Sequence, residues 1–251
     1  MYKFLAFIIG LLAASVCFAQ DKLEAERPTQ GMTPELVKGN HVQMELGFRK
    51  EKLSPGVHMY QHPSALIRYG LFNAIELRAE VVSQTIRNTI SKDKTNGLRP
   101  VEFGIKAKIL PEYKGFPSVG VVAQMGVPKF SSEDYYNARI PFEFRTLFQN
   151  TIQKNLKLQY NAGVRWEGEN RQANWMYSIT PTYEITNRFN VFAEYYAFLN
   201  KTQSAQHYID AGVEYFVNSN FMLDFIGGVG VSELASPYFI GAGASFRLPV
   251  R

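Results

Sequence analysis

The chain has 251 residues, a single cysteine and a formal net charge of +5 spread along the sequence. A charge this small and dispersed makes no case for binding to nucleic acid, and no such partner is expected. Aromatic residues make up 14% of the chain, yet its mean hydropathy is slightly negative, so membrane-spanning helices do not account for them. Transmembrane strands would, because they alternate lipid-facing and water-facing residues.

The N-terminus predicts a signal peptide over residues 1–19. Lys3 precedes an apolar run, and the small residues Cys17 and Ala19 occupy the positions that a signal peptidase recognises. An N-terminal membrane anchor is the alternative, but the run is shorter than the roughly 20 residues that a spanning helix needs. A lipoprotein modified at Cys17 is a weaker alternative, because the residues before it do not fit. Cleavage before Gln20 removes the only cysteine, so the mature chain would hold no disulfide and no thiolate.

Residues 20–40 are polar and contain prolines, and we expect them to form an extended periplasmic lead-in. From residue 41 onward the dominant pattern has period two, as in a strand with one face in lipid. It predicts one all-β domain over residues 41–251, a transmembrane antiparallel up-and-down β-barrel of about 12 strands. The predicted strands cover residues 41–49, 65–71, 75–81, 101–109, 119–127, 140–148, 156–166, 173–185, 189–199, 206–216, 221–231 and 238–247.

The connections between these strands alternate in length. The odd-numbered ones are longer, and the first three run from Glu51 to Pro63, from Ser83 to Gly97 and from Pro128 to Arg139. The even-numbered ones, such as residues 186–188, are mostly tight and rich in Asn and Pro. Outer-membrane barrels have this asymmetry, with short turns in the periplasm and longer loops outside the cell.

The second face of the predicted strands carries charge repeatedly. A packed apolar core would not accept these side chains, but a wet lumen would. The predicted lumen-lining residues are Arg49, Arg68, Glu76, Arg78, Glu80, Glu102, Lys106, Lys108, Glu143, Arg145, Lys157, Arg165, Glu194, Asp210, Glu214, Asp224 and Arg247. Their mixed signs suit salt-bridge ladders that hold a narrow barrel together, and they equally suit the wall of a small aqueous pore.

Aromatic residues near the strand ends predict the two interfacial girdles of a membrane barrel. One girdle would contain Phe72, Tyr183, Phe189, Tyr215, Phe221 and Phe246, and the other Trp166 and Trp175. The ordinary preference of aromatic residues for strands is the alternative explanation.

No catalytic residue, metal site or cofactor is predicted. The four histidines have no metal-ligand spacing, and His58 and His62 fall in a predicted surface loop. There is no G-x-S-x-G motif. His207 alone faces outward on its strand, so a membrane-embedded lipid hydrolase stays a minor alternative.

Several segments resemble one family of bacterial outer-membrane barrels, the transporters of the phenol-degradation MetA-pathway type. They are the opening Glu26-Arg27-Pro28-Thr29-Gln30-Gly31, the run VKGNHVQMELGF from Val37, LIRYGL from Leu66, IELR from Ile75 and YFIGAGASFR from Tyr238. Nearly the whole mature chain is covered, although Gln30-Gly31 departs from the usual opening. The resemblance implies a barrel fold, the outer membrane and a transport role, and it supplies no substrate.

The sequence thus predicts a non-enzymatic outer-membrane channel or transporter for small solutes, hydrophobic or aromatic ones among them. A structural or surface barrel that transports nothing is the main alternative. The expected partners are outer-membrane lipid, an unidentified small-molecule solute and the barrel-assembly machinery during biogenesis.

Overall fold

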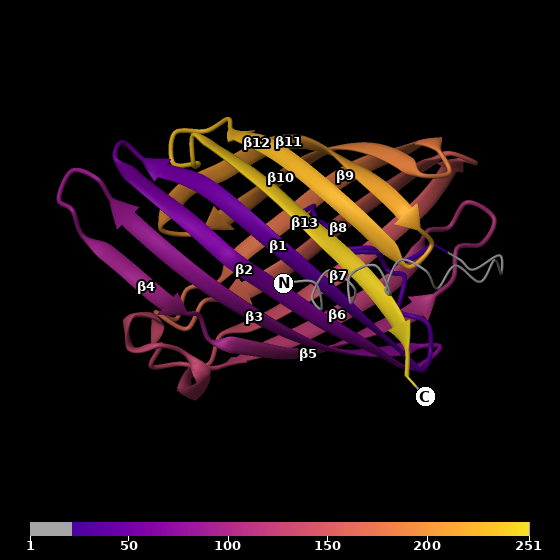
Figure 1. The fold of residues 1–251 in the computed structure, drawn as a ribbon, viewed down its shortest axis with the longest axis horizontal. Coiled ribbons are helices and arrows are strands. Elements are labelled where there is room, and N and C mark those ends of the chain that lie inside the picture. Colours follow the sequence, from indigo (N-terminus) through magenta and orange to yellow (C-terminus); the bar gives the residue numbers. More distant parts are fainter. Residues whose placement is uncertain (1–21, 251) are drawn as a thin grey trace, which may run out of the picture.

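The computed structural model describes residues 22–250, and the predicted signal peptide lies outside this range. The fold is a closed antiparallel barrel (Figure 1). Twelve strands form its wall: β1 (His41–Ser54), β2 (Val57–Phe72), β3 (Ile75–Asn88), β5 (Val101–Leu110), β6 (Ser118–Val127), β7 (Phe142–Gln153), β8 (Leu156–Trp166), β9 (Asn174–Thr186), β10 (Phe189–Asn200), β11 (Gln203–Asn218), β12 (Phe221–Gly230) and β13 (Tyr238–Pro249). An additional short strand is β4 (Lys94–Leu98), and two 3-10 turns, η1 (Pro128–Phe130) and η2 (Glu133–Tyr135), follow β6. Within the described range no helix is long and apolar enough to cross a membrane.

The barrel closes between its first and last wall strands. β1 pairs with β13 from His41 opposite Pro249 to Lys52 opposite Tyr238, and its other edge pairs with β2. Each wall strand has at least 10 residues, which matches the roughly 9–11 that a tilted strand needs to cross a bilayer. Closure leaves no unpaired sheet edge in the membrane, and the predicted barrel of about 12 strands is confirmed.

Two of the long predicted connections are wrong. The segment from Glu51 to Pro63 continues β1 and β2 to a tight turn at Gly56, where φ is +76°. The segment from Ser83 to Gly97 extends β3 and adds β4, which pairs only with the far half of β3. Beyond the lipid these strands have no apolar face to maintain, so the hydrophobic alternation fades while backbone pairing continues. His58 and His62 therefore lie in β2 rather than in a loop.

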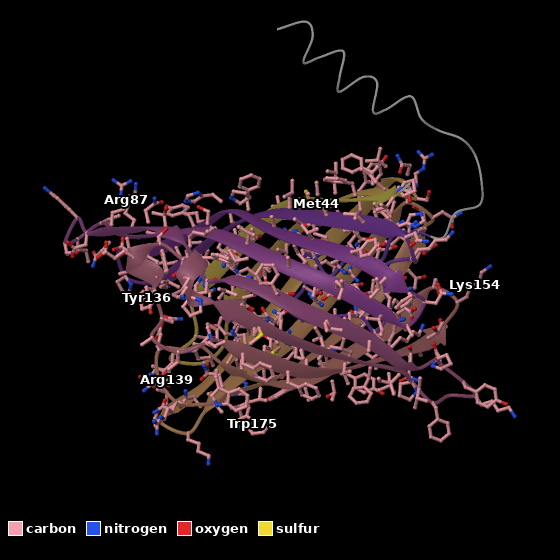
Figure 2. The ribbon with its side chains drawn as sticks, turned by 90° about the horizontal axis from the view of Figure 1, so that it is seen from below. Met44, Arg87, Tyr136, Arg139, Lys154 and Trp175 are labelled. Carbon is pink, nitrogen blue, oxygen red and sulfur yellow. The ribbon has the colours of Figure 1, made fainter. Side chains whose placement is uncertain are left out.

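The outer surface is apolar along the wall. Large hydrophobic side chains are exposed on most of the wall strands, among them Ile67, Leu77, Phe103, Ile105, Phe144, Ile179, Ile209, Phe225 and Ile240. Figure 2 shows Met44 and Trp175 on opposite sides of the barrel, while Arg87, Tyr136 and Arg139 gather at the end with the longer loops and Lys154 lies at the other end. An apolar band between polar rims is the surface that a bilayer requires.

The interior has the opposite chemistry. Among the described residues, 25 buried ones are polar or charged and 14 are hydrophobic, which inverts the balance of a soluble protein core. Burying so many polar groups is tolerable only where they are bonded to one another or to water. The barrel therefore encloses a polar lumen.

A charge placed on the lipid face should destabilise the barrel according to its depth. Ile209 lies midway along β11 and is half exposed, whereas Leu110 ends β5. We expect Ile209→Arg to lower the free energy of unfolding by roughly 2–4 kcal/mol and Leu110→Arg by about 0–1 kcal/mol. Urea titrations of the protein folded in phosphatidylcholine vesicles would measure both values. Equal losses for the two variants would contradict a membrane belt at this height.

Candidate functional site: a charged lumen that holds the N-terminal segment

The N-terminal segment, residues 22–40, lies inside the barrel. The expectation of an extended periplasmic lead-in is therefore wrong for this segment. It is anchored at the short-turn end both where it starts, at Leu23, which bonds to Ser219, and where it joins β1, at Asn40, which bonds to Gly70. Between these points it rises toward the middle of the lumen, so it enters and leaves by the same end.

Glu26 is the most heavily paired residue of the segment. Its carboxylate lies 2.6 Å from Lys106 Nζ, 3.3 Å from Arg78 Nη2 and 3.5 Å from Arg68 Nη2. Burial alone would raise the pKa of Glu26, but the positive charges of Arg78, Lys106 and Arg68 hold that pKa well below its usual range. The carboxylate is therefore charged at every physiological pH.

Arg68 joins this contact to the barrel wall. Its side chain is fully buried, with Nε 2.8 Å from Glu76 and Nη1 2.8 Å from Glu45. The second oxygens of these glutamates accept hydrogen bonds from the segment, Glu76 from the backbone N–H of Val37 and Glu45 from that of Glu26. One arginine thus orients two carboxylates that grip the segment's backbone.

Arg27 occupies a slot made of two glycines. Its guanidinium forms a bidentate pair with Asp224 on β12, at 3.0 and 3.3 Å. Gly47 and Gly243 face each other across the β1–β13 pairing, and a Cβ atom added to them would lie 1.8 and 2.4 Å from Arg27 side-chain atoms. Only glycine leaves room for this arginine at both positions.

The tip of the segment binds the wall through its backbone. Glu194 accepts hydrogen bonds from the N–H groups of Gln30 and Gly31, at 2.8 and 2.7 Å. Arg145 donates to the carbonyl oxygen of Gln30 at 2.8 Å, and Asn161 both donates to and accepts from Met32. Wall side chains therefore satisfy the buried backbone groups of the tip, and these hydrogen bonds stabilise its conformation inside the lumen.

Further ion pairs fasten the two ends of the segment. Lys22 pairs with Glu184, Glu24 with Lys157 and Glu35 with Lys108, at 2.6–2.8 Å. These side chains are about one quarter to two fifths exposed, so each pair contributes less than about 1 kcal/mol. The buried contacts near Glu26 and Arg27 dominate the binding of the segment.

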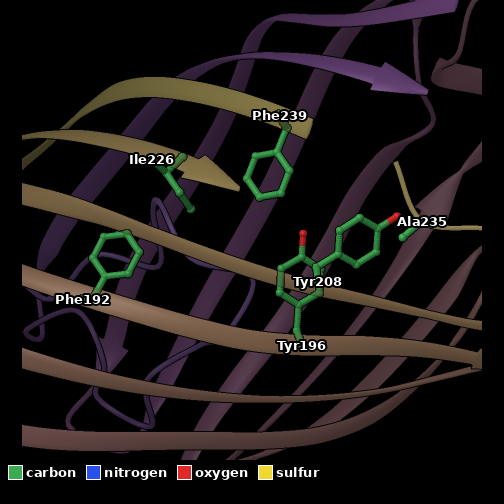
Figure 3. Packing of buried hydrophobic residues seen from close by; sticks show 6 residues of the cluster. All are labelled: Phe192, Tyr196, Tyr208, Ile226, Ala235 and Phe239. Carbon is green, nitrogen blue, oxygen red and sulfur yellow. The ribbon is translucent and has the colours of Figure 1, made fainter. Parts of the chain in front are cut away.

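A cavity of about 880 Å³ opens above the segment toward the longer loops. Its floor is residues 26–30 and Met32. One wall carries Arg165, which pairs with Glu102, Glu143 and Glu167. The other carries Tyr196, Tyr208 and Ile226. These three belong to an apolar cluster that Phe192, Ala235 and Phe239 complete, shown in Figure 3. We call this cavity the vestibule.

All seventeen predicted lumen residues are buried or half-buried, on the strand faces opposite the exposed apolar residues. The structure brings Arg68, Glu76, Arg78 and Lys106 together around Glu26, and it gathers Glu102, Glu143, Arg145 and Arg165 into a second group on the vestibule wall. Four more of them each bind the segment at a separate point: Lys108, Lys157, Glu194 and Asp224.

The remaining predicted residues pair with or lie opposite other residues of the barrel. Arg49 pairs with Glu51, Glu214 bonds to Asn190, and Arg247 bonds to Asn220. Glu80 lies on the vestibule wall opposite Glu102 in the β3–β5 pairing. Asp210 lies opposite Glu194 in the β10–β11 pairing.

The sequence-based prediction missed the segment's own contribution. Glu26, Arg27 and Glu35 belong to the site, as does Glu45 on β1. The charged pair Glu26-Arg27 could have indicated it. These residues lie in a short polar segment just before the barrel, whose predicted lumen carries both positive and negative side chains. Among the described residues no group of three or more potential ligands is placed to hold a metal ion.

The sequence matches the family described as "Putative MetA-pathway of phenol degradation" over residues 25–248. The chain belongs to this family. No curated protein matches it by sequence. The fold is similar to that of an outer membrane channel from Pseudomonas putida F1, with a TM-score of 0.66 and 8% identity over 88% of this chain and all of that one.

Two further solved structures share the fold. One is the KdgM porin in complex with disordered oligogalacturonate, with a TM-score of 0.56 and 7% identity over 82% of this chain and 98% of that one. The other is the CymD monoaromatic hydrocarbon channel, with a TM-score of 0.50 and 9% identity over 85% of this chain and 89% of that one. At such identities the likeness concerns the barrel itself.

Proposed function

We propose that this barrel is an outer-membrane channel for small solutes, and that its N-terminal segment closes the route through the lumen. The observation that carries the proposal is the vestibule, which is open toward the longer loops and ends on residues 26–30 and Met32. A solute that enters from outside reaches a charged, water-accessible chamber and then meets the segment. Because the segment enters and leaves by the short-turn end, it can withdraw toward the periplasm without threading through the barrel.

The relatives support small aromatic compounds as one solute class. The family description names phenol degradation, and one structural neighbour is a channel for monoaromatic hydrocarbons. The vestibule offers an aromatic wall at Tyr196 and Tyr208, whose rings stack with centroids 4.8 Å apart. Its volume lies within the roughly 300–1,000 Å³ typical of small-molecule pockets.

A reversible disulfide lock tests the proposal. A Cβ atom at Gly31 would lie 3.0 Å from Ser178 Oγ, so cysteines at both positions have the proximity that a disulfide needs. Cleavage of the predicted signal peptide leaves no other cysteine in the mature chain. In planar bilayers, Gly31→Cys/Ser178→Cys should conduct under reducing conditions and lose nearly all current when oxidised. The single-cysteine variants under the same oxidant are the controls.

The alternative is a structural or surface barrel that transports nothing. It predicts no current from the wild type, from the reduced double-cysteine variant or from any variant that frees the segment. Currents that are equal in the locked and unlocked states, with the disulfide verified by mass spectrometry, would refute gating by the segment while leaving conduction intact.

We also propose that the barrel has no catalytic role. The ring of His207 bonds through Nδ1 to the hydroxyl of Tyr195, at 2.7 Å, on the outer face. The hydroxyl of Ser232 accepts a hydrogen bond from the backbone N–H of His207 and donates one to the carbonyl oxygen of Ala205, so it is engaged with backbone groups. A lipid hydrolase would instead need a serine hydroxyl at the imidazole ring.

A further inference from the structure

The strands of the barrel carry charge on their outer face at one place. Within residues 22–250 the alternation of the strands directs all of their carboxylates and most of their bases into the lumen. Four charged strand residues are exceptions, and all of them are basic. They are Lys50 and Lys52 on β1, Arg87 on β3 and Lys94 on β4.

The strand register aligns three of these bases with a histidine. Lys52 lies opposite His58, and His58 lies opposite Arg87. Arg87 in turn lies opposite Lys94. Because residues directly opposite each other in antiparallel strands share a face, and neighbouring strands are about 4.8 Å apart, these side chains form a row about 14 Å long. We call this row, together with Lys50 two positions from Lys52 on the same face, the basic patch.

The positive charge of the basic patch is not compensated by the described part of the chain. None of its four lysine and arginine side chains forms an ion pair with a residue between 22 and 250. Asp93 is the one acid in the turn between β3 and β4, and its carboxylate accepts a hydrogen bond from the hydroxyl of Ser91 at 2.6 Å. Nδ1 of His58 is buried and has no hydrogen-bond partner among the described residues. The donors of the patch are therefore available to an external anion.

The basic patch begins where the apolar band of the wall ends. Lys50 and Lys52 lie opposite Ile240 and Tyr238, which are exposed on the lipid side. They occupy the two outward positions that follow Phe48, which is 58% exposed. With the strand's rise and tilt, these positions lie roughly 5 and 9 Å above Phe48, and a headgroup layer is roughly 5–8 Å thick. The patch thus lies at the height of lipid headgroups.

The leaflet that the basic patch faces is the outer one. Figure 2 shows Arg87 at the end of the barrel that carries the longer loops, and these loops lie outside the cell. Arginine pairs with phosphate through two parallel hydrogen bonds, and lysine contributes a point charge. A cluster of bases beside a membrane-spanning element is the arrangement that binds anionic lipid.

We propose that the basic patch binds the phosphate groups of anionic lipids in the outer leaflet. A row about 14 Å long spans more than one phosphate, so it fits a headgroup with two phosphates better than a headgroup with one. The patch lies on the outside of the wall, and its binding is therefore independent of the lumen and of conduction.

The test titrates the refolded mature protein in detergent with two probes, diphosphoryl lipid A and the same lipid after removal of both phosphates. Diphosphoryl lipid A should bind with at least a tenfold lower Kd. Lys52→Gln/Arg87→Gln should raise that Kd roughly thirtyfold, because each base beside an anionic lipid surface changes binding by roughly fivefold. Lys50→Gln/Lys94→Gln should act in the same direction, and it keeps the test decisive if the first variant does not fold.

The matched control is Arg171→Gln/Lys201→Gln. It removes the same two charges from exposed positions in the β8–β9 and β10–β11 connections, at the same end of the barrel, and it should change the Kd less than twofold. Equal binding of the two probes, an unchanged Kd in a folded patch variant or an equal loss in the control would overturn the proposal. Competition by inorganic phosphate at the concentration of the lipid phosphate would overturn the assignment to lipid. A wild-type dimer that the patch variants dissociate, without any preference for the phosphorylated probe, would assign the patch to a second copy of this chain instead.

Discussion

Replacing Glu26 with glutamine is expected to release the N-terminal segment and to raise the open probability of the channel by about two orders of magnitude. The substitution keeps the side chain's shape and removes the charge that faces Lys106, Arg78 and Arg68. Removing one partner of a buried ion pair costs about 3–5 kcal/mol. The cost falls on the seated state, because water reaches these bases once the segment withdraws, and each 1.4 kcal/mol is a tenfold change in population.

Single-channel recording of the Glu26→Gln variant measures this effect, and protease sensitivity of residues 22–40 reports on the same transition independently. The matched control is Glu24→Gln in the same segment, whose pair with Lys157 is about two fifths exposed and contributes less than about 1 kcal/mol. Wild-type conductance together with a protected segment in the Glu26 variant would show that the buried pair does not hold the channel closed.

The pH dependence of this contribution follows from the lowered pKa of Glu26. A carboxyl whose pKa is lower in the seated state stabilises that state fully above the ordinary carboxyl pKa and loses the effect as pH falls through the lowered value. The difference between wild type and Glu26→Gln should therefore stay constant from neutral pH down to about 4.5, the ordinary pKa of glutamate, and shrink as the pH falls below that value.

The second large effect is expected from Gly47→Val, which fills the slot of Arg27. The added Cβ would lie 1.8 Å from Arg27 Nη1, and its three nearest atoms all belong to the Arg27 side chain. The backbone of β1 cannot move away because it is paired on both edges. Arg27 must then leave Asp224, so the variant loses a buried pair and gains the roughly 1–3 kcal/mol of strain typical of overpacking. We expect a channel that stays open, with a barrel that still folds.

Gly227→Val on β12 is the control for this prediction, since the nearest atoms to its added Cβ lie 3.9 and 4.0 Å away. Conductance of the two glycine variants in planar bilayers, with heat-modifiable migration on gels as the measure of folding, would give the comparison. Closed behaviour of a folded Gly47→Val barrel would mean that Arg27 does not need its slot to keep the segment seated.

The wall of the barrel could be predicted because lipid imposes a simple rule on it. Each spanning stretch must place apolar residues outward at every second position, and residues such as Ile105, Ile179 and Phe225 follow that rule. The prediction failed where lipid no longer imposes this rule. The hairpin of β3 and β4 projects past the membrane, and its residues from Ser83 to Leu98 carry no lipid-facing stripe.

The position of the N-terminal segment could not be predicted for a different reason. No period marks residues 22–40, because their partners come from many strands and are fixed by closure of the barrel. Glu26, for example, contacts residues 42, 52 and 80 positions away in the sequence. Such contacts depend on which lumen residues lie at the same height, and a single sequence gives the alternation of each strand without its height relative to the others.

The slot of Arg27 has a consequence for how the barrel is completed. Its two glycines belong to the first and last strands of the wall, whose pairing closes the barrel, and Asp224 lies on β12 beside the last strand. Arg27 therefore lies across the strand pair that closes the barrel. The segment would then insert only when β1 and β13 pair in the correct register. A shift of one residue between these strands would place side chains where Arg27 needs empty space.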